Sequence, residues 1–246
     1  MKSFTANIFA DETVTIVAPE NSFAYWYAVK YREKFYSANA TVTAQSDGTT
    51  AKTPIIDFGS AGERVFYAIY KNGDADWTLE YSGVETMKNF PYICAKTEAN
   101  PTDKFCPTYY IAKRGDRSET NIKSIVVEEG ITDIGNCVFY KCTKVYTITL
   151  PAGITRIGQN AFWGCGGLKT LVIPDGVTKI EKNAFNGCKD LTDLTIPDSV
   201  NTLGIDILVK AFNNRAKTLT IHTTNELVID YINTNYAGQN YVIVAE

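Results

Sequence analysis

The sequence predicts a mostly β protein in which an N-terminal antiparallel β sandwich or barrel is followed by a short solenoid with a C-terminal cap. Three observations predict this arrangement. Aromatic and β-branched residues alternate within residues 1–90, and similar lines of sequence recur every 23 residues within residues 121–222. A helix signal and a final apolar strand then close the chain at residues 223–246. Residues 91–120, rich in Pro, Asp, Lys and Thr, predict an irregular connector.

The N-terminal region contains several strand patterns. In FAYWYAVKYR, residues 23–32, aromatic residues alternate with smaller or charged ones, which predicts a strand with one aromatic face. The stretch VFYAIYKNGDADWTLEY, residues 65–81, predicts a hairpin that turns at Asn72 and Gly73. Shorter strands are expected near residues 14–17, 40–44 and 55–58. Together these patterns predict the antiparallel sandwich or barrel.

The repeat predicts a solenoid. Residues 145–165 read VYTITLPAGITRIGQNAFWGC, and residues 168–188 read LKTLVIPDGVTKIEKNAFNGC. A fixed period of this size means that each turn of a coil buries its apolar side only against its neighbours. The apolar columns are Ile125, Ile148, Leu171, Leu194 and Leu219; Val127, Leu150, Ile173, Ile196 and Ile221; Ile131, Ile154, Val177 and Val200; Ile134, Ile157, Ile180 and Leu203; and Phe139, Phe162 and Phe185.

Each repeat is expected to hold a strand, a turn and a second apolar segment. The alternation in ITL and LVI predicts a short strand with two residues inward and the intervening one outward. Pro151, Pro174 and Pro197 end that strand, because Pro cannot donate to a ladder. The second segment, V-x-x-I, makes another inward face, and the Phe of the A-F pair seats a ring between turns. Four to five turns spaced about 4.8 Å apart would make a coil roughly 20 to 25 Å long.

The last part of the chain predicts a cap. In residues 223–246, Asn225 is placed to cap a helix whose apolar residues follow at helical spacing. A strand is expected at residues 241–244. Such a segment would close the end of the coil, which otherwise exposes an apolar core and unpaired strand edges.

The cysteines do not predict a metal site. The chain has 6 Cys, of which Cys142, Cys165 and Cys188 share one column of the repeat. A zinc site needs four N or S ligands that converge, and a column of single thiols does not converge. We therefore expect small buried residues beside the Phe column. For Cys94 and Cys106, a disulfide in an oxidising compartment and two free thiols both stay open.

Composition excludes two partner classes. Lys plus Arg is 24 and Asp plus Glu is 27, so a net charge of -3 gives no broad positive field, and no nucleic acid partner is expected. No apolar run reaches the roughly 18 residues of a membrane helix, so no membrane insertion is expected. The N-terminus also lacks the apolar core of a secretion signal. An initial Met and the absence of a polyhistidine tag favour a complete native gene product.

No enzyme, cofactor or metal is predicted. His222 is the single His, so a Ser-His-Asp triad or a Cys-His pair would have to use it, and it takes the place of Pro in other turns. No phosphate-binding, dinucleotide-binding or zinc-protease motif occurs. The stretch NGDAD, residues 72–76, has calcium-like spacing without the acid that an EF-hand loop requires at its end. A facing pair of acids, as in glycosidases, stays open for the N-terminal domain.

The repeat resembles the BspA-like leucine-rich repeat family, also called the Treponema type. The consensus L-x-x-L-x-[IL]-P-x-x-[VI]-x-x-I-x-x-x-A-F-x-x-C carries the resemblance, which covers residues 121 to about 222. Glu128 departs from it, because Pro is expected there, and so does the longer fourth turn through LGIDILVKAFNNRA, residues 203–216. The resemblance implies a leucine-rich-repeat solenoid with a binding surface and no conserved catalytic residues. The family is associated with bacterial surface proteins, adhesion and host contact, and it also occurs in phage proteins.

The strands offer a candidate binding face. If the apolar columns point inward, small and mostly hydroxyl side chains point outward. These are Ser124, Val126, Thr147, Thr149, Thr170, Val172, Asp193, Thr195, Thr218 and Thr220. A rigid flat face of this kind loses little side-chain entropy on binding and suits broad contact with a protein or a glycan. The competing interpretation is that Thr simply suits an exposed strand position.

A second candidate motif lies in the connector. Arg114, Gly115 and Asp116 form the tripeptide RGD, which resembles the loop that adhesive proteins use. Chance occurrence in a stretch full of charged residues is the competing interpretation.

Two functions fit these features. One is an adhesin-like attachment protein, extracellular or at the cell surface, whose solenoid contacts a protein or glycan while the N-terminal domain acts as anchor or spacer. The alternative is a structural or attachment component of a phage virion, whose N-terminal domain docks on capsid or tail proteins. The family resemblance favours the first, and the lack of a secretion signal favours the second.

Overall fold

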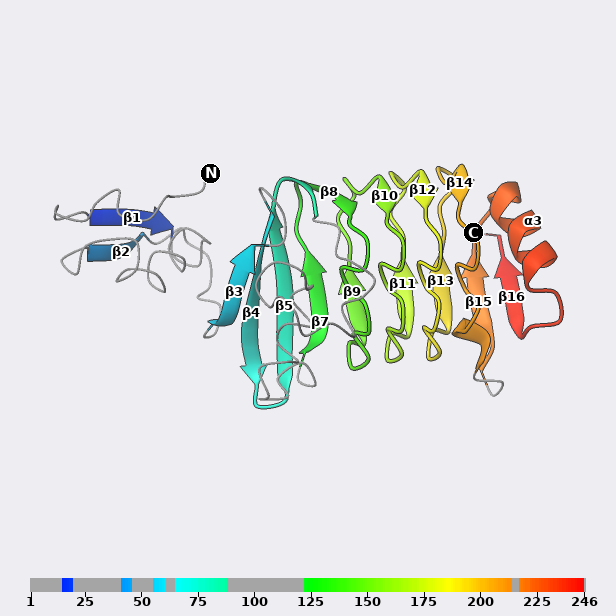
Figure 1. The fold of residues 1–246 in the computed structure, drawn as a ribbon, viewed down its shortest axis with the longest axis horizontal. Coiled ribbons are helices and arrows are strands. Elements are labelled where there is room, and N and C mark those ends of the chain that lie inside the picture. The colour runs from blue at the N-terminus through cyan, green and yellow to red at the C-terminus, as the bar shows by residue number, and fades with distance from the viewer. Residues whose placement is uncertain are drawn as a thin grey trace, which may run out of the picture.

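The computed structural model describes residues 15–19, 41–45, 55–60, 65–87, 122–213 and 217–245. From β3 to β16 the strands follow one another in a row, and helix α3 lies at the C-terminal end of that row (Figure 1). The predicted mostly β architecture with a solenoid is confirmed. No helix among the described residues is long and apolar enough to cross a membrane.

Parallel strands stack along two sides of the solenoid. On the first side the repeats contribute β7 (Ile122–Val127), β9 (Thr147–Thr149), β11 (Thr170–Val172), β13 (Asp193–Thr195) and β15 (Leu219–His222). On the second side they contribute β8 (Ile131–Ile134), β10 (Arg156–Ile157), β12 (Lys179–Ile180) and β14 (Thr202–Leu203). The first side divides into two sheets between β9 and β11. Ile125 pairs with Ile148, and Leu171 pairs with Leu194, so each 23-residue repeat makes one turn.

The third side of each turn has no strand, yet its backbone is hydrogen-bonded from turn to turn. The backbone N–H of Phe139 donates to Ala161 O at 2.9 Å, and that of Phe162 donates to Ala184 O at 2.9 Å. Two residues before each Phe the backbone is left-handed, with φ of 55° at Asn160 and 58° at Asn183. Asn tolerates this conformation better than most residues, which accounts for its place before the A-F pair.

The core runs through the middle of the stack. Phe139, Phe162 and Phe185 are fully buried, and successive ring centroids lie 5.1 and 5.5 Å apart. The Cys165 thiol donates to Phe139 O at 3.1 Å, and the Cys188 thiol donates to Phe162 O at 3.2 Å. Both thiols are buried and free, as expected from their column. Burial raises the pKa of Cys165, and its neighbouring thiols raise that pKa further, so this group is a core residue rather than a reactive thiol.

A hairpin covers the N-terminal end of the solenoid. Strands β4 (Val65–Gly73) and β5 (Asp76–Gly83) are antiparallel, and β5 pairs in parallel with β7. The following β6 (Glu85–Thr86) pairs with β8 on the second side. The Tyr81 ring lies 5.6 Å from that of Phe139 at an interplanar angle of 80°. The hairpin therefore starts the aromatic column and covers the first turn.

The hairpin turns at a different place from the one predicted. Its turn consists of Asp74 and Ala75 rather than Asn72 and Gly73, because Gly73 pairs with Asp76. The register shifts between Lys71 and Gly73, which makes Asn72 the extra residue of a bulge. The Asn72 side chain is used there, since its Nδ2 donates to Thr78 Oγ1 at 2.8 Å.

Three more strands lie where the sequence predicted strands. They are β1 (Thr15–Pro19), β2 (Thr41–Gln45) and β3 (Ile55–Ser60). Strand β3 is antiparallel to β4, but β1 and β2 pair in parallel, contrary to the antiparallel arrangement predicted. The 21 residues between β1 and β2, residues 20–40, are long enough for the crossover that parallel pairing needs.

Several predictions lie outside the described residues. They are the strand at residues 23–32, the pairing of Cys94 with Cys106, and the RGD motif of Arg114, Gly115 and Asp116. The sandwich or barrel and the domain boundaries near residues 90 and 120 stay predictions.

The C-terminal cap agrees with its sequence signals. Helix α3 (Glu226–Asn235) is capped by Asn225, whose side chain accepts from Val228 N at 3.3 Å. The same side chain donates to Val200 O at 2.7 Å, which ties the cap to the preceding turn. Strand β16 (Tyr241–Val244) pairs in parallel with β15 and ends the first side. Figure 1 shows α3 beyond β14, where it covers the open end of the second side.

The predicted register of β15 is wrong by two residues. Leu194 pairs with Ile221, and Leu219 does not share that column. The fourth turn therefore advances 27 positions, from 194 to 221, instead of the 25 that the predicted alignment with Leu219 gives. The additional residues lie in the long segment 203–216, which contains the short helix η2 (Ala211–Asn213).

Charged side chains join three turns on the second side. Arg156 Nε lies 2.8 Å from Asp133 Oδ2, and Arg156 Nη1 lies 3.2 Å from Glu181 Oε1. Lys179 Nζ lies 2.9 Å from the same Glu181 oxygen. Burial raises the pKa of Asp133, and its bond to Arg156 offsets only part of that effect. Burial also tends to raise the pKa of Glu181, but Lys179 and Arg156 together outweigh this effect and lower that pKa.

Replacing Glu181 with Gln should lower stability in a pH-dependent way. A carboxylate whose pKa is lowered by folding stabilises the protein above its ordinary pKa of 4.5, and that contribution is lost as pH falls through the folded-state value. We expect Glu181→Gln to reduce the free energy of unfolding by up to about 1 kcal/mol near pH 7 and by progressively less below pH 4.5. Urea unfolding at several pH values measures this. The exposed Asp175→Asn is the control, and equal losses at every pH would contradict the assignment.

Candidate functional site

The strand side of the solenoid alternates between buried and outward residues as predicted. Ile148 is buried between exposed Thr147 and Thr149, and Leu171 is buried between exposed Thr170 and Val172. Val172 is 64% exposed, although it is apolar. The exposed side chains that recur once per turn on these strands therefore form an outward surface.

We call this surface the strand face. Its first column consists of Ser124, Thr147, Thr170, Asp193 and Thr220, and its second column consists of Val126, Thr149, Val172, Thr195 and His222. All but one of the predicted candidates lie in these columns.

The exception is Thr218. It lies just before β15 and outside both columns, and its Oγ1 donates to Asn240 Oδ1 at 3.2 Å. Its predicted place is taken by Thr220, which pairs with Asp193, and the place predicted for Thr220 is taken by His222, which pairs with Thr195. The cause is the two-residue shift in β15.

His222 therefore does not take the place of Pro as predicted. It lies on the outward side of β15, partly exposed, and its Nε2 lies 3.7 Å from Asp193 Oδ1. The described thiols lie in the core, on the other side of the strand, so they form no Cys-His pair with it. Within residues 65–87, 122–213 and 217–245, the His, Cys, Asp and Glu side chains form no group of three or more that could hold a metal.

The strand face extends beyond the repeats at both ends. Thr78 and Glu80 of β5 pair with Ser124 and Val126, and Val242 of β16 pairs with Thr220. The repeat pattern could not find these residues, because the hairpin and the cap do not follow it. The alternation in DWTLEY was the available signal, since its apolar residues Trp77, Leu79 and Tyr81 point inward.

The chemistry of the strand face suits broad contact rather than a reaction. Its hydroxyls are close enough to interact, since Thr147 Oγ1 donates to Ser124 Oγ at 3.1 Å. Within each of the two sheets of this side, adjacent strands are tied through their backbones, which fixes the spacing of the side chains that they carry. Hydroxyls and short aliphatic groups bind by hydrogen bonds and packing.

Comparison with known proteins identifies the repeats. Residues 117–236 match the model of the BspA type leucine rich repeat region in 6 copies. The match extends past the predicted end at residue 222 and includes α3. No curated protein matches the chain.

Three solved structures illustrate the similarity. A leucine-rich repeat protein from Eubacterium ventriosum is 21% identical, with a TM-score of 0.46, over 68% of this chain and 44% of that one. A leucine rich cell surface protein from Faecalibacterium prausnitzii is 22% identical, with a TM-score of 0.39, over 71% and 46%. The T. pallidum leucine rich repeat protein is 20% identical, with a TM-score of 0.40, over 70% and 71%. The chain thus spans less than half the length of the first two.

The identity of the repeats is supported by the agreement between the residue columns of the structure and the match to the family model. The inward columns, the Phe stack and the thiols beside it recur once per turn in the structure, and the family model covers the same turns. Residues 117–236 of this chain are a BspA type leucine-rich repeat region.

Proposed function

We propose that this chain is a non-catalytic binding and attachment protein that contacts a protein or a glycan through the strand face. It acts extracellularly or at a cell surface, with the N-terminal β domain as anchor or spacer. The single observation that supports this most is the strand face itself, two columns of mostly small side chains held at fixed spacing by paired strands within each of two sheets.

The strand face is suited to binding because its side chains and backbone lose little conformational entropy when a partner covers them. Thr and Val have few rotamers, so little side-chain entropy is lost when a partner covers them. The backbone beneath is already fixed by hydrogen bonds between turns, so a partner does not have to order it. Exposed methyl groups of the Thr and Val side chains add apolar contact. Val172, for example, is 64% exposed. Hydroxyls beside these groups offer donors and acceptors to an amide or a sugar.

The repeat family supports the same class of function, because BspA-like repeats are associated with bacterial surface proteins and adhesion. The virion alternative, with capsid or tail proteins as partners, stays a prediction of the sequence. No feature of the described residues distinguishes such a partner from one on a cell surface.

Placing charge on the strand face should abolish attachment without unfolding the protein. We expect the triple variant Thr147→Lys, Thr170→Lys, Thr195→Lys to bind cell-envelope fragments at least about tenfold more weakly than the parent. Lysine at these outward positions would block close contact, while the buried columns stay intact. Binding of labelled protein to immobilised envelope fragments from animal and bacterial cells measures this, with a melting curve for each variant.

The matched control places the same three charges on other sides of the solenoid. Thr155, Thr178 and Thr202 are exposed and lie next to or within the second-side strands. Their change to Lys should leave binding within about twofold of the parent. If the strand-face variant binds as well as this control, the strand face is not the contact surface.

A further inference from the structure

A hollow opens on the third side of the solenoid. Its volume is about 480 Å³, and two glycines from successive turns, Gly164 and Gly187, line it. Their φ angles are 74° and 81°, in the left-handed region that disfavours a side chain. Lys141 takes the same position one turn earlier, with φ of 60°. The glycines therefore leave room where the first turn carries a long side chain.

The hollow is basic. Lys141, Lys144, Lys189 and Lys210 line it, and Asp190 is its one lining carboxylate. Asp190 is already engaged, because its Oδ1 lies 3.0 Å from Lys217 Nζ. In the part of the chain that the structure describes, no carboxylate forms an ion pair with Lys144, Lys189 or Lys210.

This local charge runs against that of the whole molecule. The chain as a whole carries -3, so the cluster is not a sample of a generally basic surface. Several lysines facing one concavity raise the local concentration of anions there. The hollow is thus suited to a ligand with a negative group.

An aromatic platform lies at the edge of the hollow. Trp163 lines it and stacks on buried Tyr140, with centroids 4.8 Å apart and an interplanar angle of 10°. The Lys141 ammonium lies 5.7 Å from the Trp163 ring centroid, on the same platform. At this position the next turn has Asn186, so the aromatic stack ends at Trp163. A partly exposed indole beside ammonium groups offers an apolar surface next to positive charge.

We propose that this hollow binds an acidic carbohydrate, with a sugar ring packed on Trp163 and its carboxylate or sulfate group held by the surrounding lysines. The apolar C–H face of a pyranose matches the indole, and its anionic substituent matches the ammonium groups. A single-stranded nucleic acid would also combine stacking with phosphate contacts, but it requires a basic groove that follows several nucleotides. Here one ring and one local cluster of lysines line an open hollow of about 480 Å³.

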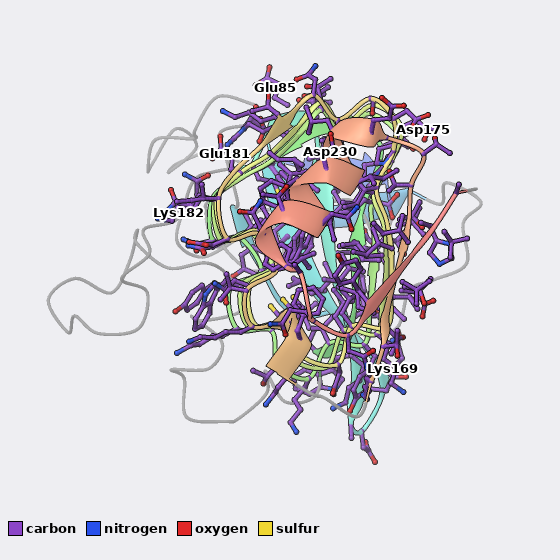
Figure 2. The ribbon with its side chains drawn as sticks, turned by 90° about the vertical axis from the view of Figure 1, so that its right-hand side faces the viewer. Glu85, Lys169, Asp175, Glu181, Lys182 and Asp230 are labelled. Atoms are coloured by element: carbon purple, nitrogen blue, oxygen red, sulfur yellow. The ribbon has the colours of Figure 1, made fainter. Side chains whose placement is uncertain are left out.

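The two binding surfaces are separate. Figure 2, a view along the solenoid, shows Lys182, just after strand β12, and Lys169, just before strand β11, toward the two ends of the third side. The residues that line the hollow belong to this third side, whereas strands β7, β9, β11, β13 and β15 carry the strand face. The carbohydrate site therefore does not rest on the proposed function of the strand face. Variants of one surface should leave the other intact.

The test is isothermal titration calorimetry of the full chain with a chondroitin sulfate hexasaccharide. Neutral cellohexaose and an oligothymidylate of similar length are the comparison probes. We expect the sulfated hexasaccharide to bind and the other two to bind at least about tenfold more weakly. Absence of binding by the sulfated probe, equal binding of cellohexaose, or tighter binding of the oligothymidylate would each overturn the proposal.

Variants separate the specific site from general ion exchange. Trp163→Ala and the double variant Lys144→Ala, Lys189→Ala should each weaken hexasaccharide binding at least about tenfold. The matched double variant Lys169→Ala, Lys182→Ala removes the same charge from exposed positions outside the hollow and should change binding less than about twofold. Equal losses in both double variants would mean that net charge alone attracts the ligand.

Two further variants keep the result interpretable. Trp163→Phe retains a ring on Tyr140 and should keep most of the affinity, whereas a loss as large as in Trp163→Ala would contradict the stacking role. The strand-face variant Thr147→Lys, Thr170→Lys, Thr195→Lys should bind the hexasaccharide like the parent. A strand-face variant that loses envelope binding but keeps hexasaccharide binding would show that the two sites fail independently.

Discussion

Replacing Leu171 with Asp is expected to unfold the solenoid. Leu171 is 2% exposed and its strand pairs with β13, so its side chain lies among the apolar columns of successive turns. Removing a buried Leu side chain costs about 2 to 5 kcal/mol, and burying a carboxylate without a partner adds several more. That sum is comparable with the whole stability of a typical domain, about 5 to 15 kcal/mol. Because each turn supports its neighbours, the loss should spread to both sides of the altered turn.

The neighbouring residue provides the matched control for this substitution. Val172 is 64% exposed on the same strand, so Val172→Asp introduces the same carboxylate on the outward side. We expect it to change the free energy of unfolding by no more than about 1 kcal/mol. Far-UV circular dichroism during denaturant unfolding measures both variants. A transition in Leu171→Asp that matches that of Val172→Asp would show that Leu171 does not face a core.

The core of the repeats could be predicted because each turn repeats the same chemistry. Phe139, Phe162 and Phe185 occupy one column, and the structure stacks their rings. An apolar residue type that recurs at a fixed period needs the same environment in each turn, and for a large apolar side chain in a coil that environment is the core. The cap was equally accessible, since Asn225 is a local helix signal that depends little on distant contacts.

The register of β15 could not be predicted from the same pattern. Leu219 and Ile221 are both apolar and lie two residues apart, so both point inward. A shift of two residues keeps every apolar side chain on the same side, and only the partner in the ladder changes. Alternation therefore fixed the inward side of β15 but not the partner of each residue. For that reason Thr218 was wrongly placed on the strand face and His222 was left out of it.

The hairpin of residues 65–81 was predicted, but its turn was misplaced for a different reason. Asn-Gly favours a two-residue turn, but the structure places Asn72 in a bulge and turns at Asp74 and Ala75. In this register Tyr81 is fully buried and packs against Phe139. Contact with the solenoid thus outweighs the local preference of the turn, and a preference read from the hairpin alone could not include that contact.

The basic hollow also could not be found from the repeat. The equivalent positions of four turns hold Lys141, Gly164, Gly187 and Lys210, a column without a shared chemistry. The proposed site also depends on Trp163, which lies beside Gly164 in sequence and beside Lys141 only in space. Sequence periodicity reveals what turns share, whereas a site for one ligand is made where they differ.

Deleting part of the chain should have opposite effects depending on whether the deletion keeps the period. Removal of residues 168–190 takes out 23 residues, one complete turn, and joins Gly167 to Leu191 in the same column order. The remaining turns can then stack as before, since each interface uses the same columns. Removal of residues 164–190 takes out 27 residues, joins Trp163 to Leu191 and leaves one turn of 19 positions. The coil can accommodate a longer turn, as the 27-position fourth turn shows. A turn four residues short of the period cannot keep all its columns in register with the neighbouring turns.

The decisive measurement is the denaturant unfolding curve of these two deletion variants, recorded by far-UV circular dichroism beside the parent. A solenoid with a 23-residue turn predicts one cooperative transition for the variant lacking residues 168–190 and no native transition for the variant lacking residues 164–190. Loss of the transition in the 23-residue deletion, or retention of the same transition in both, would contradict turns that shelter one another in register.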